Sequence, residues 1–414
     1  NTQYFGYYDY CSSNWNTKND KSFNATVDAI TTHLLYLYLI TQDEQYLNKA
    51  YLIADNMQNH FVESMNNQTI GFAEEYNKYW SIDANETMTI MGHVLKTAWC
   101  FARLYHFNPN PEYMASAEKL ITNVLEKGYD NEYGGPYKDY NRITGEMLMW
   151  GNPDTAKAWW QMEQAITAGL QMYKVTQKDI YLKMADESLD FFMKYFVDHQ
   201  YGEVYENRTR YGAQTWGENK GNPNKAGYHS IELGYYTYLY GKFFVTKEPI
   251  TLYYKFQAGE DRNIYLNPVE MPLSEYEIKE IVYNNQPYTD YVASAKTIHL
   301  PDSIGGKFKV TFNLKQTDVA NNQDITPSNY ELAQNYPNPF NPSTNIQFTT
   351  AESGNVNLTV YDMLGREVKT LVNGYINSGV HSVSFNAKNL SSGIYIYRLK
   401  TNDKVMSKKM TLLK

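Results

Sequence analysis

Three short segments of the sequence place histidine or tryptophan close to the start of a predicted helix. The segments are Gly92–Trp99, Lys157–Ala165 and Lys225–Glu232. Two of them contain a histidine, His93 and His229, and histidine is the side chain whose charge changes near neutral pH. The middle segment contains the pair Trp159-Trp160, whose ring faces suit the C–H faces of sugars. These groups become chemically useful together only if the three helix starts meet in one pocket.

The region that must position them, residues 1–246, reads as a series of helices. Apolar residues recur at helical spacing over 22–40, 45–64, 85–107, 112–127, 155–176, 180–197 and 226–245. Gly-aromatic punctuation at Asp130–Pro136 and Tyr201–Tyr205 predicts short β-hairpins between successive helix pairs. A period of about 65–70 residues fits an α/α toroid, in which inner-helix N-termini converge on one pocket. A full (α/α)6 barrel needs more helices than these seven, so we expect a partial barrel whose missing helices precede residue 1.

The remainder of the chain changes to a period of two residues, which is typical of strands. We predict a small β-domain over 247–314, including Ile250–Phe256, Ile278–Tyr283 and Phe308–Phe312. We expect this domain to be a packing module or a spacer, with glycan binding as the alternative role. Polar residues 315–330 read as a linker, and 331–414 as a second small all-β domain, a sandwich.

Composition limits the possible functions. The formal net charge is −8, but residues 331–414 carry nine basic and five acidic side chains, which leaves 28 basic against 40 acidic in 1–330. An acidic body argues against nucleic acid as a partner. No apolar run is long enough to span a membrane. Two cysteines, Cys11 and Cys100, cannot form a disulfide framework, and no metal-ligand spacing is present, so we predict no metal site. The 40 tyrosines and 7 tryptophans suit a carbohydrate cleft.

The order and spacing of the three segments resemble the N-acylglucosamine 2-epimerase and cellobiose 2-epimerase family. In that family a Gly-His segment leads into a Trp-bearing helix, a Lys-x-Trp-Trp segment follows about 65 residues later, and a Tyr-His segment begins the last helix. The matching residues here are Gly92-His93 with Trp99, Lys157 with Trp159-Trp160, and Tyr228-His229. The resemblance covers roughly residues 1–245 and implies an (α/α)6 barrel.

The resemblance also implies a reaction without metal or cofactor on a mono- or oligosaccharide. His93 and His229 would be the catalytic bases: one removes the proton beside the open-chain aldehyde and the other returns a proton on the opposite face. Return to the same carbon is epimerisation at C2, whereas return to the neighbouring carbon is aldose–ketose isomerisation. The expected substrate-binding residues are Trp99, Trp159, Trp160, Gln164, Tyr228 and Glu232.

Three departures from the family pattern keep other functions open. Lys96 stands where the family has Glu, Gln164 stands where it has Glu, and the Asn24–Asp28 helix lacks the family's histidines. A lysine ammonium near His93 would disfavour the protonated imidazole. Glu74 and Glu75 lie on a predicted loop and are expected to be solvated. One alternative is a glycoside hydrolase or polysaccharide lyase on the same toroid, with the carboxylates drawn from Asp28, Asp154, Glu163 and Glu232. A non-catalytic sugar-binding relative is the other.

The C-terminal part resembles the sorting domain of the type IX secretion system. The segments that carry the likeness are Asn335–Thr344 (NYPNPFNPST), Val360–Val368 and Ser392–Leu399. The resemblance implies a β-sandwich that an outer-membrane translocon reads, and therefore a protein that passes the periplasm and outer membrane to be secreted or attached to the cell surface. Because such a protein needs an export signal and the sequence starts at Asn1, we expect upstream sequence.

Overall fold

The computed structural model describes residues 6–14, 18–82, 85–149, 151–217, 220–223, 225, 227–268, 270–272, 274–315, 330–335, 338–376, 379–401 and 404–413. The chain forms two compact units, Asn1–Lys315 and Gln316–Lys414. Most of the predicted linker, residues 316–329, lies outside the described residues. No helix in the part that the structure describes is long and apolar enough to cross a membrane.

All seven predicted helical segments are helical. They are α1 (Phe23–Ala29), η1 (Ile30–Leu34) and α2 (Leu35–Thr41), α3 (Glu44–Asn56) with η2 (Met57–Val62), α4 (Met91–Phe107), α5 (Pro111–Lys127), α6 (Trp159–Thr176), α7 (Asp179–Phe191) with η3 (Phe192–Phe196), and α8 (Tyr228–Tyr240) with η4 (Gly241–Thr246). Helices α4 and α6 are buried along most of their surface, whereas α3, α5 and α7 bury one face. This contrast marks α4 and α6 as inner helices and the other three as outer helices.

Helix α4 begins six residues later than predicted and α6 four residues later, because strands precede them. Strand β5 (Met88–Ile90) leads directly into α4, and β9 (Lys157–Ala158) leads into α6. Each pairs with a strand that follows the next outer helix, β6 (Asp139–Asn141) and β10 (Asn207–Arg208). Strand β3 (Lys21–Ser22) precedes α1 and pairs in the same way with β4 (Glu75–Tyr76). The repeating unit is therefore strand, inner helix, outer helix, strand.

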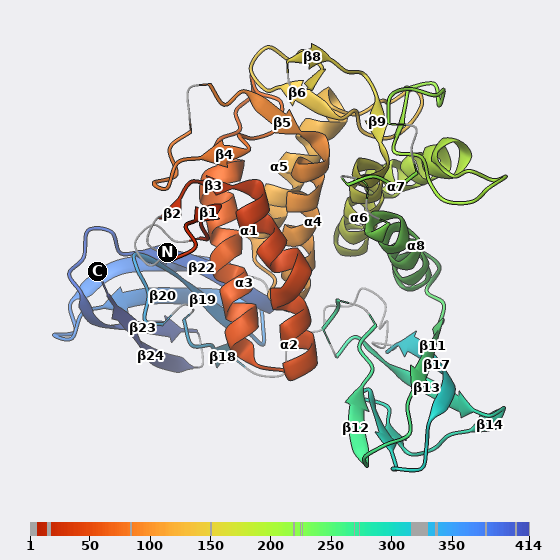
Figure 1. Ribbon diagram of the computed structural model, residues 1–414. Coiled ribbons are helices and arrows are strands. Elements are labelled where there is room, and N and C mark those ends of the chain that lie inside the picture. The colour runs from red at the N-terminus through yellow and green to blue at the C-terminus, as the bar shows by residue number, and fades with distance from the viewer. Residues whose placement is uncertain are drawn as a thin grey trace. The chain divides into compact units, whose positions relative to one another are not determined.

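These strand pairs collect the long connections at one end of the helices (Figure 1). The predicted hairpins lie in two of the connections, where Tyr129 bridges Pro136 and Val197 bridges Val204. In both, an aspartate begins the turn and a residue with positive φ ends it, as in Asp130 to Gly135. Four smaller strands complete this region: β1 (Tyr10–Cys11) pairs with β2 (Lys18–Asn19), and β7 (Leu148–Met149) with β8 (Asn152–Pro153). Every inner helix thus starts at the end where the loops gather.

The β-module that follows is built of two antiparallel sheets. Its strands are β11 (Ile250–Phe256), β12 (Arg262–Tyr265), β13 (Tyr276–Tyr283), β14 (Gln286–Pro287), β15 (Tyr291–Val292), β16 (Thr297–Leu300) and β17 (Gly306–Leu314). The sheet orders are β11-β17-β13-β14 and β12-β16-β15. Buried side chains such as Tyr276 and Phe312 belong to the same core cluster as Leu239 and Phe243 of the last helix. The module therefore packs on the helices.

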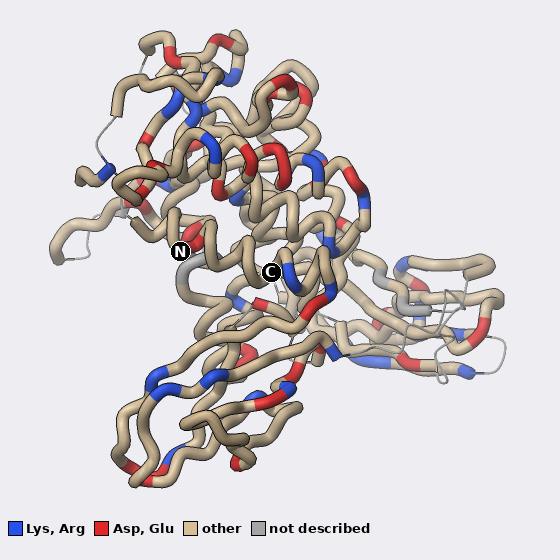
Figure 2. Tube along the Cα trace, turned by 90° about the vertical axis from the view of Figure 1, so that its right-hand side faces the viewer, with Lys and Arg blue, Asp and Glu red and all other residues tan. Residues whose placement is uncertain are grey.

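Its loop 266–272 brings a carboxylate into the helical core. Glu270 is 2% exposed and accepts hydrogen bonds from Tyr236 (3.2 Å) and Tyr240 (2.7 Å) of α8. Its Oε2 lies 3.9 Å from Arg103 Nη2 of α4, a guanidinium that also stacks on the Trp99 ring. Figure 2 shows acidic and basic residues interspersed over the helices. Glu270 and Arg103 are also oppositely charged neighbours, but both are buried. Because a buried charge without its partner is costly, the β-module and the helices depend on each other.

The C-terminal unit consists of two antiparallel sheets around one core. Its strands are β18 (Glu331–Leu332), β19 (Ser343–Thr350), β20 (Gly354–Tyr361), β21 (Glu367–Ile376), β22 (Gly379–Asn386), β23 (Gly393–Lys400) and β24 (Val405–Leu412), in the orders β18-β19-β22 and β21-β20-β23-β24. Side chains of both sheets, among them Phe348, Leu358 and Tyr397, share a core cluster. The Tyr397 hydroxyl donates to the Ala333 carbonyl and accepts from the Asn335 N–H. The segment NYPNPF, of which Tyr336 and Pro337 lie outside the described residues, thus begins with a residue anchored to β23.

Removing the Glu270 carboxylate tests whether the β-module and helices form one cooperative unit. Glu270→Ala leaves the Arg103 guanidinium buried without its counter-charge, so we expect the free energy of unfolding to fall by about 3–5 kcal/mol. Urea unfolding followed by circular dichroism measures this change. The matched control is Glu260→Ala, at an exposed position of the same module, with an expected change below about 0.5 kcal/mol. Equal stability of the two variants would contradict the coupling.

Candidate active site

The starts of four helices meet around one cavity of about 200 Å³. Helix α1 contributes Phe23, Asn24 and Asp28, α4 contributes His93 and Lys96, α6 contributes Trp159 and Trp160, and α8 contributes Tyr228 and His229. The positive ends of helix dipoles therefore lie at this cavity. The three segments singled out from the sequence are brought together.

His93 is held by a buried carboxylate from a distant loop. Its Nδ1 lies 2.7 Å from Oε2 of Glu74, and the other carboxylate oxygen, Oε1, accepts the Ile90 N–H at 2.8 Å. The imidazole also stacks on the Phe23 ring, with centroids 3.7 Å apart and planes 10° apart. A carboxylate at Nδ1 favours the tautomer with a lone pair on Nε2, so the ring is oriented with one nitrogen left for chemistry. The expectation that Glu74 is solvated was wrong, because its side chain is only 5% exposed, whereas Glu75 is exposed as predicted.

His229 has a second buried carboxylate at the same ring nitrogen. Its Nδ1 lies 3.3 Å from Oε2 of Glu163, which is 1% exposed. Glu163 also accepts the Thr167 hydroxyl at 2.9 Å and the side-chain amide of Gln164. The Gln164 carbonyl in turn accepts the Trp99 indole N–H at 2.7 Å. Glu163 thus supplies a carboxylate next to the position where the family pattern has Glu and this chain has Gln164.

The Trp160 indole is a close neighbour of both histidines. Its ring is 5.3 Å from the His93 imidazole and 5.8 Å from that of His229, centroid to centroid. The same indole packs on Gly92, where any Cβ would collide with it. The Gly92 N–H donates to the side-chain carbonyl of Gln161 at 2.9 Å. The glycine of the Gly-His segment is therefore required by the close approach of α4 and α6.

The two unusual residues Lys96 and Asp28 form a pair. Their Nζ–Oδ1 distance is 2.6 Å, and both line the cavity. Burial lowers the pKa of Lys96, but the Asp28 carboxylate more than compensates, so the pKa lies above its ordinary value. The ammonium is thus held charged by Asp28. The lysine that departs from the family pattern is balanced by an aspartate that also departs from it.

The sequence-predicted residues divide between the cavity wall and a layer behind it. His93, His229, Trp159, Trp160 and Tyr228 line the cavity, whereas Trp99, Gln164 and Glu232 do not. Trp99 and Gln164 are buried and support Glu163. Phe23, Asn24 and Glu74 are neighbours of the histidines that sequence reasoning missed as functional residues. No local signal marks Glu74, because it lies 19 residues before His93.

One carboxylate behind the cavity has a strongly altered pKa. Burial and repulsion by Glu163 raise the pKa of Glu232 from 4.5 to about 7. Glu163, His229 and Glu232 are also, among the described residues, a group whose possible metal-ligand atoms all lie within 4.8 Å of one another. Their carboxylate and imidazole groups are donor types that divalent cations accept. The closeness of Glu163 is also, after burial, the second cause of the raised pKa of Glu232.

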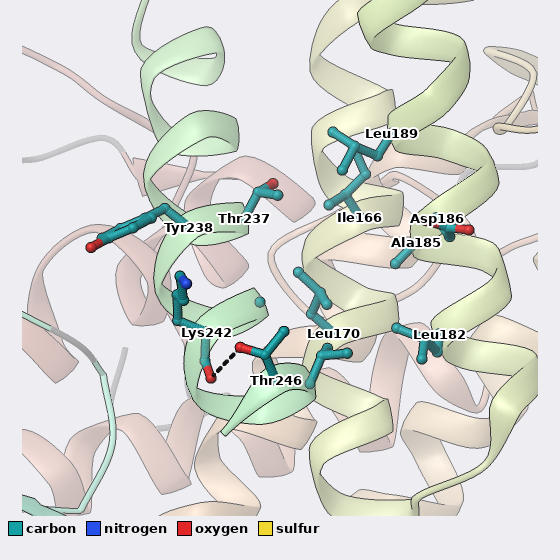
Figure 3. A pocket seen from close by; sticks show the side chains of 12 residues that line it. Ile166, Leu170, Leu182, Ala185, Asp186, Leu189, Thr237, Tyr238, Lys242 and Thr246 are labelled. Carbon is teal, nitrogen blue, oxygen red and sulfur yellow. Dashed lines mark hydrogen bonds between the residues drawn. The ribbon is translucent and has the colours of Figure 1, made fainter. Parts of the chain in front are cut away.

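A second hollow offers no comparable chemistry. This groove has a volume of about 300 Å³ and lies between α6, α7 and the α8–η4 segment. It is lined mainly by apolar side chains such as Ile166, Leu170 and Leu189 (Figure 3). The charged residues in its described lining are Asp186 and Lys242. The cavity with the two histidines is therefore the candidate active site.

The pKa of Glu232 predicts a pH dependence of stability. Between pH 4.5 and about 7 the folded protein keeps a proton that the unfolded chain has lost, so the free energy of unfolding falls as the pH rises. Glu232→Gln removes this contribution. We expect the Tm of Glu232→Gln minus that of the unsubstituted protein to be larger at pH 8 than at pH 5. Differential scanning calorimetry measures it, with exposed Glu260→Gln as the control; a difference independent of pH would refute the assignment.

Comparison with known proteins agrees with this geometry. The N-acylglucosamine 2-epimerase family matches residues 9–232, and the family of secretion system C-terminal sorting domains matches residues 334–412. A D-mannose isomerase of Marinomonas mediterranea is 25% identical over 241 residues, which are 55% of this chain and 59% of that protein. The N-acylglucosamine 2-epimerase of Homo sapiens is 26% identical over 141 residues, 33% of this chain and 32% of that protein.

A solved structure supports the same relationship. The crystal structure of D-mannose isomerase superposes with a TM-score of 0.51 and 25% identity, covering 57% of this chain and 59% of that one. The chain thus spans about three-fifths of the length of D-mannose isomerase. Both family resemblances predicted from the sequence are confirmed, and the sorting domain indicates export to the cell surface or the medium. The chain belongs to the N-acylglucosamine 2-epimerase family and carries, at residues 334–412, a secretion system C-terminal sorting domain.

Proposed function

We propose that this protein is an exported sugar 2-epimerase or aldose–ketose isomerase in which His93 and His229 transfer the proton. The observation that carries the proposal is the pair of imidazoles on two different helices, α4 and α8, each with a carboxylate at Nδ1 and each against the same Trp160 indole. Both imidazoles line one cavity. The family includes relatives named for both reaction types, N-acylglucosamine 2-epimerase and D-mannose isomerase.

The reaction proceeds through an enediolate. Nε2 of one histidine takes the proton from C2 of the open-chain aldose, and the electron pair moves onto the carbonyl oxygen. In epimerisation the second imidazole, protonated, returns a proton to C2 from the opposite face and the carbonyl re-forms. In isomerisation a proton returns to C1 while the proton of the C2 hydroxyl moves to the C1 oxygen, which leaves a ketose. After epimerisation the first histidine is protonated and the second is neutral, which is the state that the reverse reaction requires.

The carboxylates make this proton transfer feasible. When Nε2 accepts a proton the imidazolium faces Glu74 or Glu163, so its charge is balanced without movement of solvent. The enediolate oxygen gains negative charge in the same step. The Lys96 ammonium and the positive ends of α1, α4, α6 and α8 lie at the cavity and stabilise that negative charge. A neutral sugar is the substrate best suited to this balance.

The alternatives have less support. A glycoside hydrolase needs two carboxylates facing each other across the bond, roughly 5–10 Å apart. Of its four candidates Asp28 lines the cavity, and it is bound to Lys96. Asp154 is paired with Lys138, and Glu163 and Glu232 lie together behind His229. A non-catalytic sugar-binding protein would not need two buried carboxylates, one oriented against each imidazole.

Isotope exchange tests the proposal. In deuterated water with mannose or glucose, we expect deuterium at C2, detected by NMR, and a loss of more than about a hundredfold in His93→Ala and in His229→Ala. Exchange is expected to survive dialysis against EDTA. Reducing ends released from oligosaccharides without C2 exchange would establish the hydrolase instead. Exchange that persists in both histidine variants would refute the assignment of the bases.

Glu74 is expected to act as a positioning residue for His93. Glu74→Gln keeps the size of the side chain but removes the charge that balances the imidazolium, so kcat should fall about tenfold to a hundredfold while KM changes little. Glu75→Gln, at the exposed neighbouring position, is the matched control and should retain activity. The pH profile of kcat separates the two roles, because loss of the carboxylate shifts its midpoint, whereas a purely structural defect lowers activity at every pH.

A further inference from the structure

Exposed aromatic side chains gather on the connections that lead into the inner helices. We name six of them the aromatic rim: Tyr79, Tyr133, Tyr201, Tyr211, Trp216 and Tyr228. They lie in the three long connections before α4, α6 and α8, or in the first residue of α8. The short turns at the opposite helix ends, 42–43, 108–110 and 177–178, contain no aromatic residue. All six members of the aromatic rim therefore lie on connections or a helix start at the end that holds the cavity.

Trp216 is the most informative member of the aromatic rim. It is 45% exposed, although an indole ordinarily gains from burial. Its Nε1 is 3.4 Å from Asp154, and the Lys138 ammonium lies 4.1 Å from its ring centroid. Lys138 is itself buried and bound to Asp154 at 2.8 Å. An exposed indole held in one orientation by a buried ion pair is a prepared stacking surface, because little side-chain entropy remains to be lost on binding.

The support of Trp216 is continuous with the candidate active site. The backbone carbonyl of Lys138 accepts the N–H of Met91, two residues before His93. The neighbouring Asp139 accepts a hydrogen bond from Gln161, which holds Gly92. The same elements therefore position both the histidine and the exposed indole.

A second part of the aromatic rim is built in the same way. Tyr133 and Tyr211 meet edge to face with centroids 5.2 Å apart. The Arg210 guanidinium lies 5.0 Å from one ring and 5.5 Å from the other, and it is bound to Asp130 at 2.8 Å. Aromatic rings interleaved with charged groups suit a ligand that offers C–H faces and hydroxyls together, which describes a sugar chain better than an apolar protein surface.

We propose that the aromatic rim binds a glycan chain of three or more sugar units whose reducing end enters the cavity. The inference rests on the proposed function of that cavity. At about 200 Å³ the cavity is smaller than the ~300–1,000 Å³ of typical ligand sites, so further sugar units must lie outside it, over the rim. The sorting domain adds that the protein works outside the cell, where carbohydrate is often polymeric.

The test compares chain lengths. C2 exchange at the reducing end is measured with mannose and mannotetraose, and with glucose and cellotetraose. We expect a higher kcat/KM for at least one tetrasaccharide than for its monosaccharide. Trp216→Ala should lower the ratio of these two kcat/KM values, tetrasaccharide to monosaccharide, about fivefold to tenfold. Trp216→Phe, which keeps a ring, should retain most of the ratio. The control Tyr253→Ala removes an aromatic side chain that is 74% exposed on the β-module and should leave the ratio unchanged.

Failure of the rim and failure of the proposed reaction give different results. Equal kcat/KM for monosaccharides and tetrasaccharides, or an unchanged ratio in correctly folded Trp216→Ala, would overturn the rim. If no sugar exchanges deuterium, the proposed reaction is refuted. Calorimetric titration with the tetrasaccharides then still tests whether the aromatic rim binds a glycan chain. Binding that weakens in Trp216→Ala would support it, and a Kd that does not improve with chain length would refute it. Circular dichroism confirms the fold of each variant.

Discussion

The close approach of α4 and α6 is the contact on which the candidate site depends. Gly92 lets the Trp160 indole lie against the start of α4, and Gln161 accepts the Gly92 N–H. That indole is then flanked by both imidazoles. A side chain at position 92 would collide with the Trp160 and Gln161 side chains, so α4 and α6 could not approach as closely. Gly92 therefore permits the position of the indole that contacts both imidazoles.

Burial of paired charges is the second constraint. Glu74 and Glu163 each hold an imidazole, and Glu270 reaches Arg103 from the β-module. A buried carboxylate is expensive without a partner, so each pair restricts its helices to one arrangement. Such pairs give orientation rather than a large net gain in stability. The proposed proton transfer would need that orientation, because each imidazole would have to keep one nitrogen directed to the substrate.

The β-module and the long connections extend what the helices provide. Loop 266–272 carries Glu270 into the helical core, where Tyr236 and Tyr240 satisfy it. At the other end, short strands bind the start of each inner helix to the connection that follows the outer helix. The loops are therefore tied to the helix starts. Side chains on those loops, Trp216 among them, are therefore positioned by the same elements that position the cavity.

Local patterns in the sequence determined the elements and the two family relationships. Helical periodicity identified all seven helical segments, since apolar side chains on one face are a property of each segment alone. The helix starts were less predictable: residues 85–90 and 155–158 continue the apolar pattern, but strand pairing with distant loops makes parts of them β5 and β9. Motif spacing also identified His93, His229 and the Trp159-Trp160 pair, which line one cavity in the structure.

The partners of those residues were decided by tertiary structure alone. The sequence places Lys96 one helix turn from His93, but only the fold pairs that ammonium with Asp28. The sequence also places Glu74 on a loop, but only the fold buries it against the His93 imidazole. Charge compensation depends on distance in space, and the paired residues are 68 and 19 positions apart in the chain. Sequence therefore determines which groups are present and on which helices they lie, whereas packing decides which charges meet.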